Sequence, residues 1–353
     1  MDDLAESLGR SPEQFPHALD VRNDCISFIH LSRTDYLNAS FLDARILTPS
    51  TIGHPIPWRQ VAASIEAARL EERCDFIFHI GHVGSTLLSR LMGEHPRVLA
   101  LREPMILRSF AQLKIQPGTR PPQWSDRDFD VRLGGCLKLL SRTFEAQQTA
   151  LIKATSFVSD MAADLLSGSS APRALLMHVS PASYFATILG GPNSRVEAKM
   201  LAPGRLQRLH RRIGADAWRL ESLSEGEMLA LSWACEMSAL AQASRAAARR
   251  VLRIDFDEFL TDPVPLLTAA FRHVGIDAAP SDVSAILAGP HMRRYSKAPE
   301  HAYDAALRLA VLDEARAAHG AEISRGLAWL EHAAANFSPI REAMAFAQAA
   351  PAG

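Results

Sequence analysis

Residues 76–90, FIFHIGHVGSTLLSR, decide the fold. The stretch opens with apolar residues typical of a buried strand, turns at Gly81 and Gly84, and continues with apolar residues at helical spacing. Glycines let backbone N–H groups converge, and the start of a helix adds partial positive charge. Ser85 and Thr86 supply further donors. The stretch predicts a strand, an anion-binding turn and a helix; an ordinary turn with hydroxyl caps is the alternative.

Further short apolar runs alternate with helical segments and predict a mostly parallel sheet with helices on both faces. These runs cover residues 98–101, 150–153, 174–179 and 251–254. A long helix is expected from Ser224, because Glu227 stands three positions later and completes a capping box. Other helices are expected over residues 263–274 and over residues 302–333, the second with a break near Gly320.

The segments around this core are less regular. Residues 25–31 predict a strand, and Ser32 is expected to cap a short helix that runs through residues 41–45. Residues 116–130 and 190–212 are polar and rich in proline, and are expected to be surface loops. The alanine-rich tail from residue 343 is expected to fray.

Composition limits the possible functions. Hydrophobic residues at 48% and charged residues at 22% are typical of a globular chain. A formal net charge of -1 argues against a dedicated nucleic-acid binder. The four cysteines form no CxxC pair, so neither a zinc site nor a disulfide framework is expected. The acidic start and the lack of a long apolar stretch predict a cytoplasmic protein without a membrane span.

The turn lacks the lysine of the GxxxxGK[ST] motif, which argues against ordinary nucleotide hydrolysis. It resembles instead the 5′-phosphosulfate loop of the sulfotransferase family, PKSGTT or PRSGTT. The matching positions, in order, are Gly81, His82, Val83, Gly84, Ser85 and Thr86. The helix and turn that follow resemble the tyrosylprotein branch and bacterial relatives in layout, and the resemblance extends over about residues 75–300.

The resemblance implies roles for residues beyond the loop. Glu103 stands 103 − 84 = 19 positions after Gly84, where that branch has the glutamate that acts as base on the acceptor. Lys153 resembles the lysine after the third strand, and residues 251–276 resemble the late strand-and-helix signature. Either Glu103 or Lys153 could instead be a simple ion-paired residue. Asp255 is expected to have a structural hydrogen-bonding role.

Two departures from the family bear on function. His82 stands where the family has Lys or Arg, and it is the second catalytic candidate or a histidine packed beside the turn. The family's arginine for the 3′-phosphate is replaced by Val179, whereas Thr187 keeps the hydroxyl eight positions later. In the family a basic loop near the C-terminus often closes over the nucleotide, so the resemblance implies this role for Ser296 and Lys297; a solvated basic face is the alternative. A second basic cluster is a weaker candidate for this role: Arg205, Arg208, Arg211 and Arg212.

Together these features predict a P-loop NTPase-like three-layer α/β/α fold with a mostly parallel central sheet. Residues 1–72 would form an appendage of strand and helices, residues 73–278 the core, and residues 279–353 a lid loop and helices, within one compact domain. The resemblance implies sulfuryl transfer from 3′-phosphoadenosine 5′-phosphosulfate to an unidentified hydroxyl or amine acceptor, with no metal. The alternatives are a catalytically impaired nucleotide-binding relative and a phosphotransferase that uses ATP.

Overall fold

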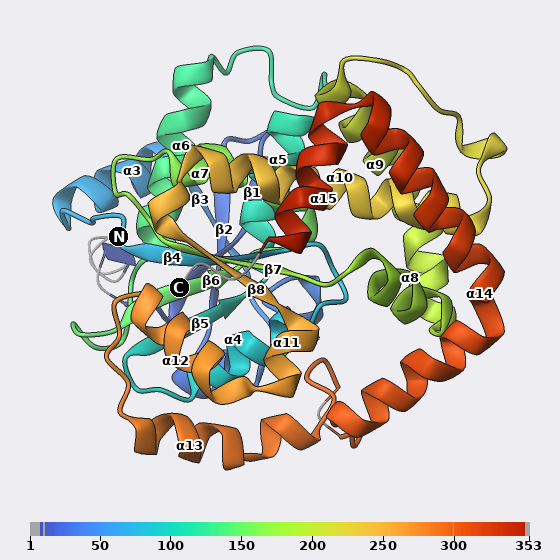
Figure 1. The fold of residues 1–353 in the computed structure, drawn as a ribbon. Coiled ribbons are helices and arrows are strands. Elements are labelled where there is room, and N and C mark those ends of the chain that lie inside the picture. The colour runs from blue at the N-terminus through green and yellow to red at the C-terminus, as the bar shows by residue number, and fades with distance from the viewer. Residues whose placement is uncertain (1–7, 10, 299, 350–353) are drawn as a thin grey trace.

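The centre of the molecule is a five-stranded parallel sheet (Figure 1). The computed structural model describes residues 8–9, 11–298 and 300–349. The sheet has the order β5-β6-β4-β7-β8, so its first strand along the chain lies in the middle. This is the predicted sheet. Its strands are β4 (Cys74–His79), β5 (Val98–Arg102), β6 (Thr149–Lys153), β7 (Ala174–His178) and β8 (Val251–Asp255).

Helices cover both faces of the sheet and complete the predicted three-layer α/β/α fold (Figure 1). On one face lie α4 (Ser85–Gly93), α11 (Phe256–Thr261), α12 (Pro263–His273), α13 (Pro280–Ala288) and the 3-10 turn η5 (Pro290–Arg293). On the other lie α5 (Met105–Ile115), α6 (Asp126–Leu140), η2 (Ser156–Met161), α7 (Ala162–Leu166), α10 (Glu225–Ala246) and α15 (Ser338–Gln348). Beside the sheet are α8 (Pro181–Leu189), α9 (Pro192–Ile213), η3 (Leu220–Ser222), η4 (Ala248–Arg250) and α14 (Ala305–Asn336).

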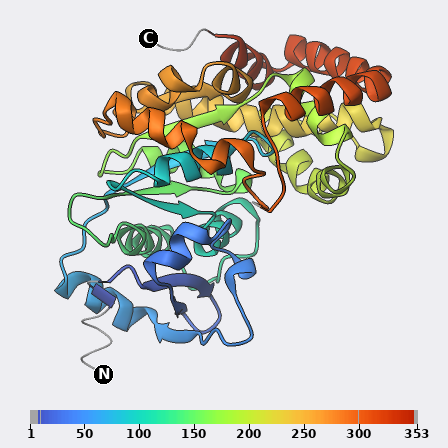
Figure 2. The same cartoon turned by 90° about the horizontal axis from the view of Figure 1, so that it is seen from below.

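The N-terminal appendage contains an antiparallel sheet where the sequence predicts a single strand. It lies at the β5 edge of the central sheet, at the end of the molecule away from the C-terminal helices (Figure 2). The two additional strands contain prolines, which weaken their strand pattern in the sequence. The elements are β1 (Gln14–Asp20), β2 (Cys25–His30), α2 (Arg33–Asn38), η1 (Ala44–Ile46), β3 (His54–Pro57) and α3 (Trp58–Ala67).

Helix α2 is shorter than predicted. Ser32 caps it as expected, but it ends at Asn38 and does not run through residues 41–45. Two buried guanidinium groups hold its C-terminal carbonyls: Arg90 donates to the carbonyl of Asn38 at 3.2 Å, and Arg102 donates to that of Ala39 at 2.6 Å. Cations are favourable at this end of a helix. The chain is thereby turned toward the carboxyl edge of the central sheet.

Two other predictions of irregular structure are wrong. Most of residues 190–212 form the 22-residue helix α9. Its few buried apolar residues and the proline at position 203 obscure the helical pattern in the sequence. The tail from residue 343 is helical through residue 348, because Ile340 and Ala343 pack in the core, while residues 350–353 lie outside the described part. Residues 126–130 of the other predicted loop begin α6.

Several local predictions are confirmed. Ser224 and Glu227 form the expected capping box at the start of α10. Helix α14 is interrupted at His319, where φ is -122° and ψ is 19°, next to the predicted break. The side chain of Asp255 accepts hydrogen bonds from the N–H groups of Asp257 and Glu258 and so caps α11, which is the structural role expected. Among the described residues, no helix has the length and apolar character needed to cross a membrane.

Acid is expected to destabilise the fold through His178, the last residue of β7. Its side chain is 1% exposed, and burial, together with the charge of Arg253, lowers its pKa to about 4. An unfolded histidine titrates near 6.5, so the unfolded state binds more protons between pH 6.5 and 4 and stability falls as pH falls through this range. From pH 7 to pH 5 this residue alone should lower the free energy of unfolding by about 2 kcal/mol.

Urea unfolding at pH 7 and pH 5 measures this effect in the native protein and in His178→Leu. Between pH 7 and pH 5 the free energy of unfolding should fall by about 2 kcal/mol less in the variant than in the native protein, whatever the stability of the variant at pH 7. Equal losses in the two proteins would show that His178 is not the source. Burial also lowers the pKa of other histidines, so part of the acid sensitivity should remain in the variant: His17, His79, His95 and His273.

Candidate active site

A cavity of about 630 Å³ opens at the carboxyl edge of the central sheet. Open α/β sheets bind their ligands at this edge, and the volume is typical of a site for a small molecule. All the site residues predicted from the sequence line it, although they come from five separate parts of the chain. They are Gly81, His82, Val83, Gly84, Ser85, Thr86, Glu103, Lys153, Thr187, Ser296 and Lys297.

The turn between β4 and α4 has the backbone conformation of an anion-binding nest. Gly81, His82 and Gly84 have φ values of 86°, 56° and 65°. Positive φ is unfavourable for a residue with a side chain, so its presence at His82 shows how strongly the surroundings hold the turn. At Gly84 a side chain is also excluded by space, since a Cβ atom would lie 2.0 Å from the ring of Phe256.

Most donors of this turn are left without partners among the described residues. Among the residues that the structure describes, none of the N–H groups of residues 82–86 donates a hydrogen bond to another protein atom. The hydroxyl of Thr86 is buried and also lacks a partner. Buried polar groups are nearly always satisfied, so unpaired donors at a helix start are the arrangement expected of a site that binds an anion. A phosphate or sulfate group fits them.

Glu103 faces the same cavity from the end of β5. The sheet register pairs Arg102 with Lys153, and the N–H of Glu103 donates to the carbonyl of Lys153 at 2.7 Å. The carboxylate of Glu103 forms an ion pair with the ammonium of Lys153, which is 1% exposed. Burial lowers the pKa of Lys153, and the charge of Glu103 opposes that effect. Glu103 also has a positive φ of 56°, a costly conformation that often marks functional positions.

The appendage contributes a second cation beside Glu103. A nitrogen of the Arg45 guanidinium lies 3.5 Å from Oε2 of Glu103, and Nε of the same group donates to Asp43 at 2.8 Å. The guanidinium carbon is 3.3 Å from the ring centroid of Phe41, within the range of a cation–π interaction. This wall of the cavity therefore consists of residues from the segment that follows α2.

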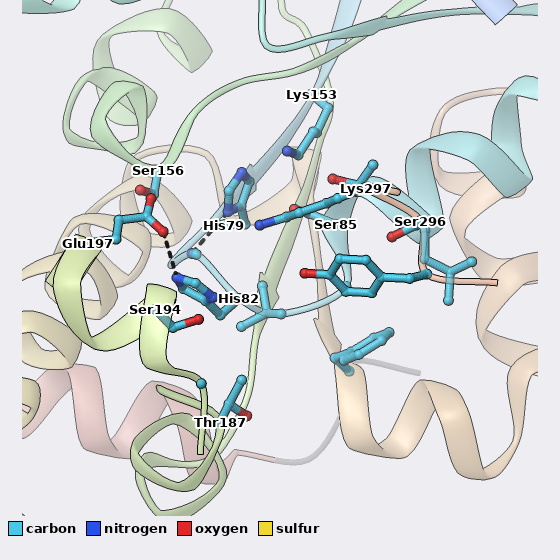
Figure 3. Close-up of a pocket in the computed structure, with 18 of the residues that line it drawn as sticks. His79, His82, Ser85, Lys153, Ser156, Thr187, Ser194, Glu197, Ser296 and Lys297 are labelled. Atoms are coloured by element: carbon cyan, nitrogen blue, oxygen red, sulfur yellow. Dashed lines mark hydrogen bonds and ion pairs between the residues drawn. The ribbon is translucent and has the colours of Figure 1, made fainter. Parts of the chain in front are cut away.

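His82 is engaged by a carboxylate from α9. Its Nε2 lies 3.3 Å from Oε2 of Glu197 (Figure 3). The hydrogen bond from His82 lowers the pKa of Glu197 to about 2, although burial acts in the opposite direction. Glu197 is therefore ionised near neutral pH. The pair places an imidazole, with a carboxylate behind it, at the position where the sulfotransferase loop carries a cation.

The lid loop folds over the glycine turn. The carbonyl of Ser296 accepts a hydrogen bond from Nε of Arg90 at 2.9 Å, which ties the loop to α4. The side chain of Lys297 points into the cavity (Figure 3). Its charge contributes, after burial and Lys153, to the lowered pKa of His79. Lys297 therefore supplies positive charge beside the turn.

Of the residues that could contact a 3′-phosphate, some line the cavity and one is buried away from it. Thr187 lines the cavity, and its hydroxyl donates to the carbonyl of Ser183 at 2.7 Å. Val179 is fully buried, so its side chain cannot replace the missing arginine at the cavity wall. Arg308 of α14 is 5% exposed and lines the cavity, where its guanidinium donates to Oδ1 of Asp257 at 2.8 Å and lies 4.9 Å from the ring centroid of Phe256.

The second basic cluster is largely a buried ionic network rather than a solvated face. Arg205 and Arg208 donate to Glu236 at 3.1 and 2.6 Å, and Arg212 pairs with Asp160. Only Arg205 of this cluster also lines the cavity. The network connects α9 to α10 and η2. It holds in place the helix that carries Glu197, and most of its charge is neutralised there.

No group of His, Cys, Asp or Glu side chains in the described part of the chain has an arrangement suited to a metal ion. All four cysteines are free thiols.

Among the comparisons with known proteins, the search of solved structures gives matches. No family model and no curated protein matches the chain. A sulfotransferase domain from the curacin biosynthetic pathway matches at 13% identity and a TM-score of 0.39, over 69% of this chain and 90% of the domain. A sulfotransferase domain from the Synechococcus olefin synthase matches at 14% identity and a TM-score of 0.40, and the match covers 69% of this chain and 86% of the domain. Sulfotransferase STF9 from Mycobacterium avium matches at 14% identity and a TM-score of 0.37, and the match covers 73% of this chain and 81% of STF9.

These three structures are sulfotransferases. This is the family whose loop the sequence resembles. At these identities and TM-scores the likeness assigns no role to any residue, and the functional proposal rests on the cavity itself.

Several residues of the cavity are not predicted from the sequence. Phe41, Arg45, Glu197 and Arg308 come from segments without a motif, and only tertiary structure brings them to the site. His79 is different, because it is the polar residue that ends an apolar strand directly before the glycine turn. This position, which can be read from the sequence, indicates that His79 lies beside the turn.

Proposed function

We propose that the protein is a sulfotransferase that moves a sulfuryl group from 3′-phosphoadenosine 5′-phosphosulfate to a hydroxyl or amine acceptor. One observation carries the proposal: unpaired donors of the glycine turn and the carboxylate of Glu103 face the same cavity. The donors suit an anionic sulfuryl donor. The carboxylate suits the removal of a proton from the group that attacks it.

The reaction would be a single in-line displacement. The acceptor oxygen or nitrogen forms a bond to sulfur while the bond from sulfur to the 5′-phosphate oxygen breaks, and the electron pair leaves with the phosphate. Oε2 of Glu103 takes the acceptor's proton, because Oε1 is held by Lys153 and Arg45 contacts Oε2 only at 3.5 Å. The products are the sulfated acceptor and 3′,5′-adenosine diphosphate.

Fixed donors would stabilise the charge that moves onto the leaving phosphate. The N–H groups of the turn and the hydroxyls of Ser85 and Thr86 bind the phosphosulfate, while His82 and Lys153 act near the bridging oxygen and sulfuryl group. Such groups stabilise charge most effectively when they are already in place before the reaction. The positive φ values of the turn support such preorganisation.

The 3′-phosphate needs a cation to replace the arginine absent at position 179. Lys297 and Arg308 both line the cavity and lie on the side of the C-terminal lid. Thr187 supplies a hydroxyl that lines the same cavity. We assign the 3′-phosphate to these three residues, since charge-assisted hydrogen bonds are about twice as strong as neutral ones.

Thermal unfolding with different nucleotides tests the proposal. A ligand at a hundred times its Kd stabilises the native state by about 2.7 kcal/mol, so millimolar 3′,5′-adenosine diphosphate should raise the Tm by several degrees without metal. ATP with Mg²⁺ should have a much smaller effect. A shift with ATP and Mg²⁺ alone would favour a phosphotransferase, and no shift with either nucleotide would remove the donor assignment.

Transfer of labelled sulfate from the donor to a panel of phenols, amines, sugars and peptides tests turnover separately. The engagement of His82 by Glu197 supports the alternative of an impaired relative, because the histidine is then less available to the donor. Nucleotide binding without transfer to any acceptor would favour that alternative.

A further inference from the structure

His79 has a hydrogen-bonding pattern that defines its tautomer. It is the last residue of β4, and its Nδ1 accepts a hydrogen bond from the N–H of Gly81 at 3.0 Å (Figure 3). A ring nitrogen that accepts carries no proton, so the proton of the neutral ring is on Nε2. The same contact removes one N–H group of the glycine turn from the set available to a ligand.

The Nε2–H group of His79 is a buried donor without a partner. The side chain is 5% exposed and lines the cavity, and Nε2 has no hydrogen-bond partner among the described residues. Burial, followed by the positive charges of Lys153 and Lys297, holds the pKa of His79 well below its usual value, although the nearby backbone of Ala154 acts in the opposite direction. The ring is therefore neutral at pH 7, and a neutral imidazole of this tautomer offers one N–H donor.

The ring lies between the glycine turn and Lys153 (Figure 3). Lys153 is paired with Glu103, the proposed base, so this position is where a sulfuryl group would pass from the phosphate to the acceptor. A bound anion with several oxygen atoms would give this donor a partner.

We propose that His79 is a further catalytic residue, whose Nε2–H donates a hydrogen bond to an oxygen of the transferring sulfuryl group. The inference rests on the proposed function, because it takes the sulfuryl donor as ligand. It implies that His79 distinguishes the sulfated nucleotide from the spent one. The spent nucleotide lacks the sulfuryl oxygens, so it does not make this contact.

Two substitutions separate the two nitrogens of His79. In His79→Asn, Oδ1 takes the place of Nδ1 and can still accept from Gly81, but no donor replaces Nε2. In His79→Gln, the amide nitrogen takes the place of Nε2, whereas the acceptor for Gly81 is lost. Calorimetric Kd values for 3′-phosphoadenosine 5′-phosphosulfate and for 3′,5′-adenosine diphosphate are measured for both variants and the native protein.

The ratio of the two Kd values in each protein isolates the sulfuryl contact. We expect His79→Asn to weaken binding of the sulfated nucleotide about tenfold and to leave the spent nucleotide within about twofold. His79→Gln should keep the native ratio even if both affinities fall. A native ratio in His79→Asn overturns the inference, and so does an equal loss for both nucleotides, which would assign His79 only to support of the turn.

Nitrogen-15 spectra of the histidine side chains in the native protein provide a test without substitution. The Nε2–H tautomer is expected for His79, with a change at Nε2 on addition of the sulfated nucleotide that is absent with the spent one. The Nδ1–H tautomer would overturn the inference. If the native protein binds neither nucleotide, the proposed function fails; if it binds both and His79→Asn keeps the native ratio, only the role of His79 fails.

Discussion

Replacement of Glu103 by glutamine should reduce sulfuryl transfer by about a hundredfold to ten-thousandfold, the range typical of a lost general base. Glutamine keeps the size of the side chain but cannot take the acceptor's proton. Binding of 3′,5′-adenosine diphosphate should remain within about twofold, because the nucleotide is held by the glycine turn and not by this carboxylate. Turnover with an acceptor that the native protein sulfates, together with calorimetry of the nucleotide, measures both effects.

The ion pair with Lys153 requires a control for this experiment. Loss of the Glu103 charge leaves a buried ammonium without its partner, and an unpaired buried charge can be strongly destabilising. Since burial already lowers the pKa of Lys153, the amine can release its proton and limit this cost. The double variant Glu103→Gln with Lys153→Met removes both charges. If Glu103→Gln retained native turnover, Glu103 would be an ion-paired structural residue and not the base.

Replacement of Gly84 by alanine should abolish measurable nucleotide binding and lower stability by about 2 to 6 kcal/mol. Two costs add: a positive φ with a side chain costs about 1 to 3 kcal/mol, and overpacking costs a similar amount. The added methyl group would lie 2.0 Å from the ring of Phe256. Either the turn or the start of α11 must move. Calorimetry with 3′,5′-adenosine diphosphate and urea unfolding measure the two losses.

Gly118 provides the matched control. It has a φ of 76°, close to the 65° of Gly84, but a Cβ atom there would meet nothing within 4 Å. Gly118→Ala should therefore show only the conformational cost, about 1 to 3 kcal/mol, with native nucleotide affinity. Adding Phe256→Ala to Gly84→Ala should relieve the steric part of the loss. Native binding by Gly84→Ala alone would contradict the role assigned to the turn.

The strands and helices around the central sheet are predictable because their patterns are local. Each parallel strand is a short apolar run, and the residue after it must reach the carboxyl edge. The sequence alone therefore suffices to place Glu103 and the glycine turn at one edge of the sheet. Lys153 can be placed with them for the same reason, since it ends the neighbouring strand in the sheet.

The remaining part of the site depends on contacts between distant segments. Arg45 reaches the cavity from a segment that follows α2, where Arg90 and Arg102 bind the carbonyls at the end of that helix. No periodicity in the sequence encodes that interaction. Glu197 is positioned by α9, a helix whose narrow apolar stripe and internal proline resemble a loop pattern. His79 is visible in the sequence, but its role depends on which ring nitrogen Gly81 occupies.

A crystal structure with bound 3′,5′-adenosine diphosphate tests the central claim most directly. The 5′-phosphate should accept hydrogen bonds from the N–H groups of residues 82–86 and from the hydroxyl of Thr86, with the carboxylate of Glu103 across the cavity from it. The 3′-phosphate should contact Lys297 or Arg308. A nucleotide bound elsewhere, or a 5′-phosphate that does not touch the turn, would show that the glycine turn is not the site of the phosphosulfate.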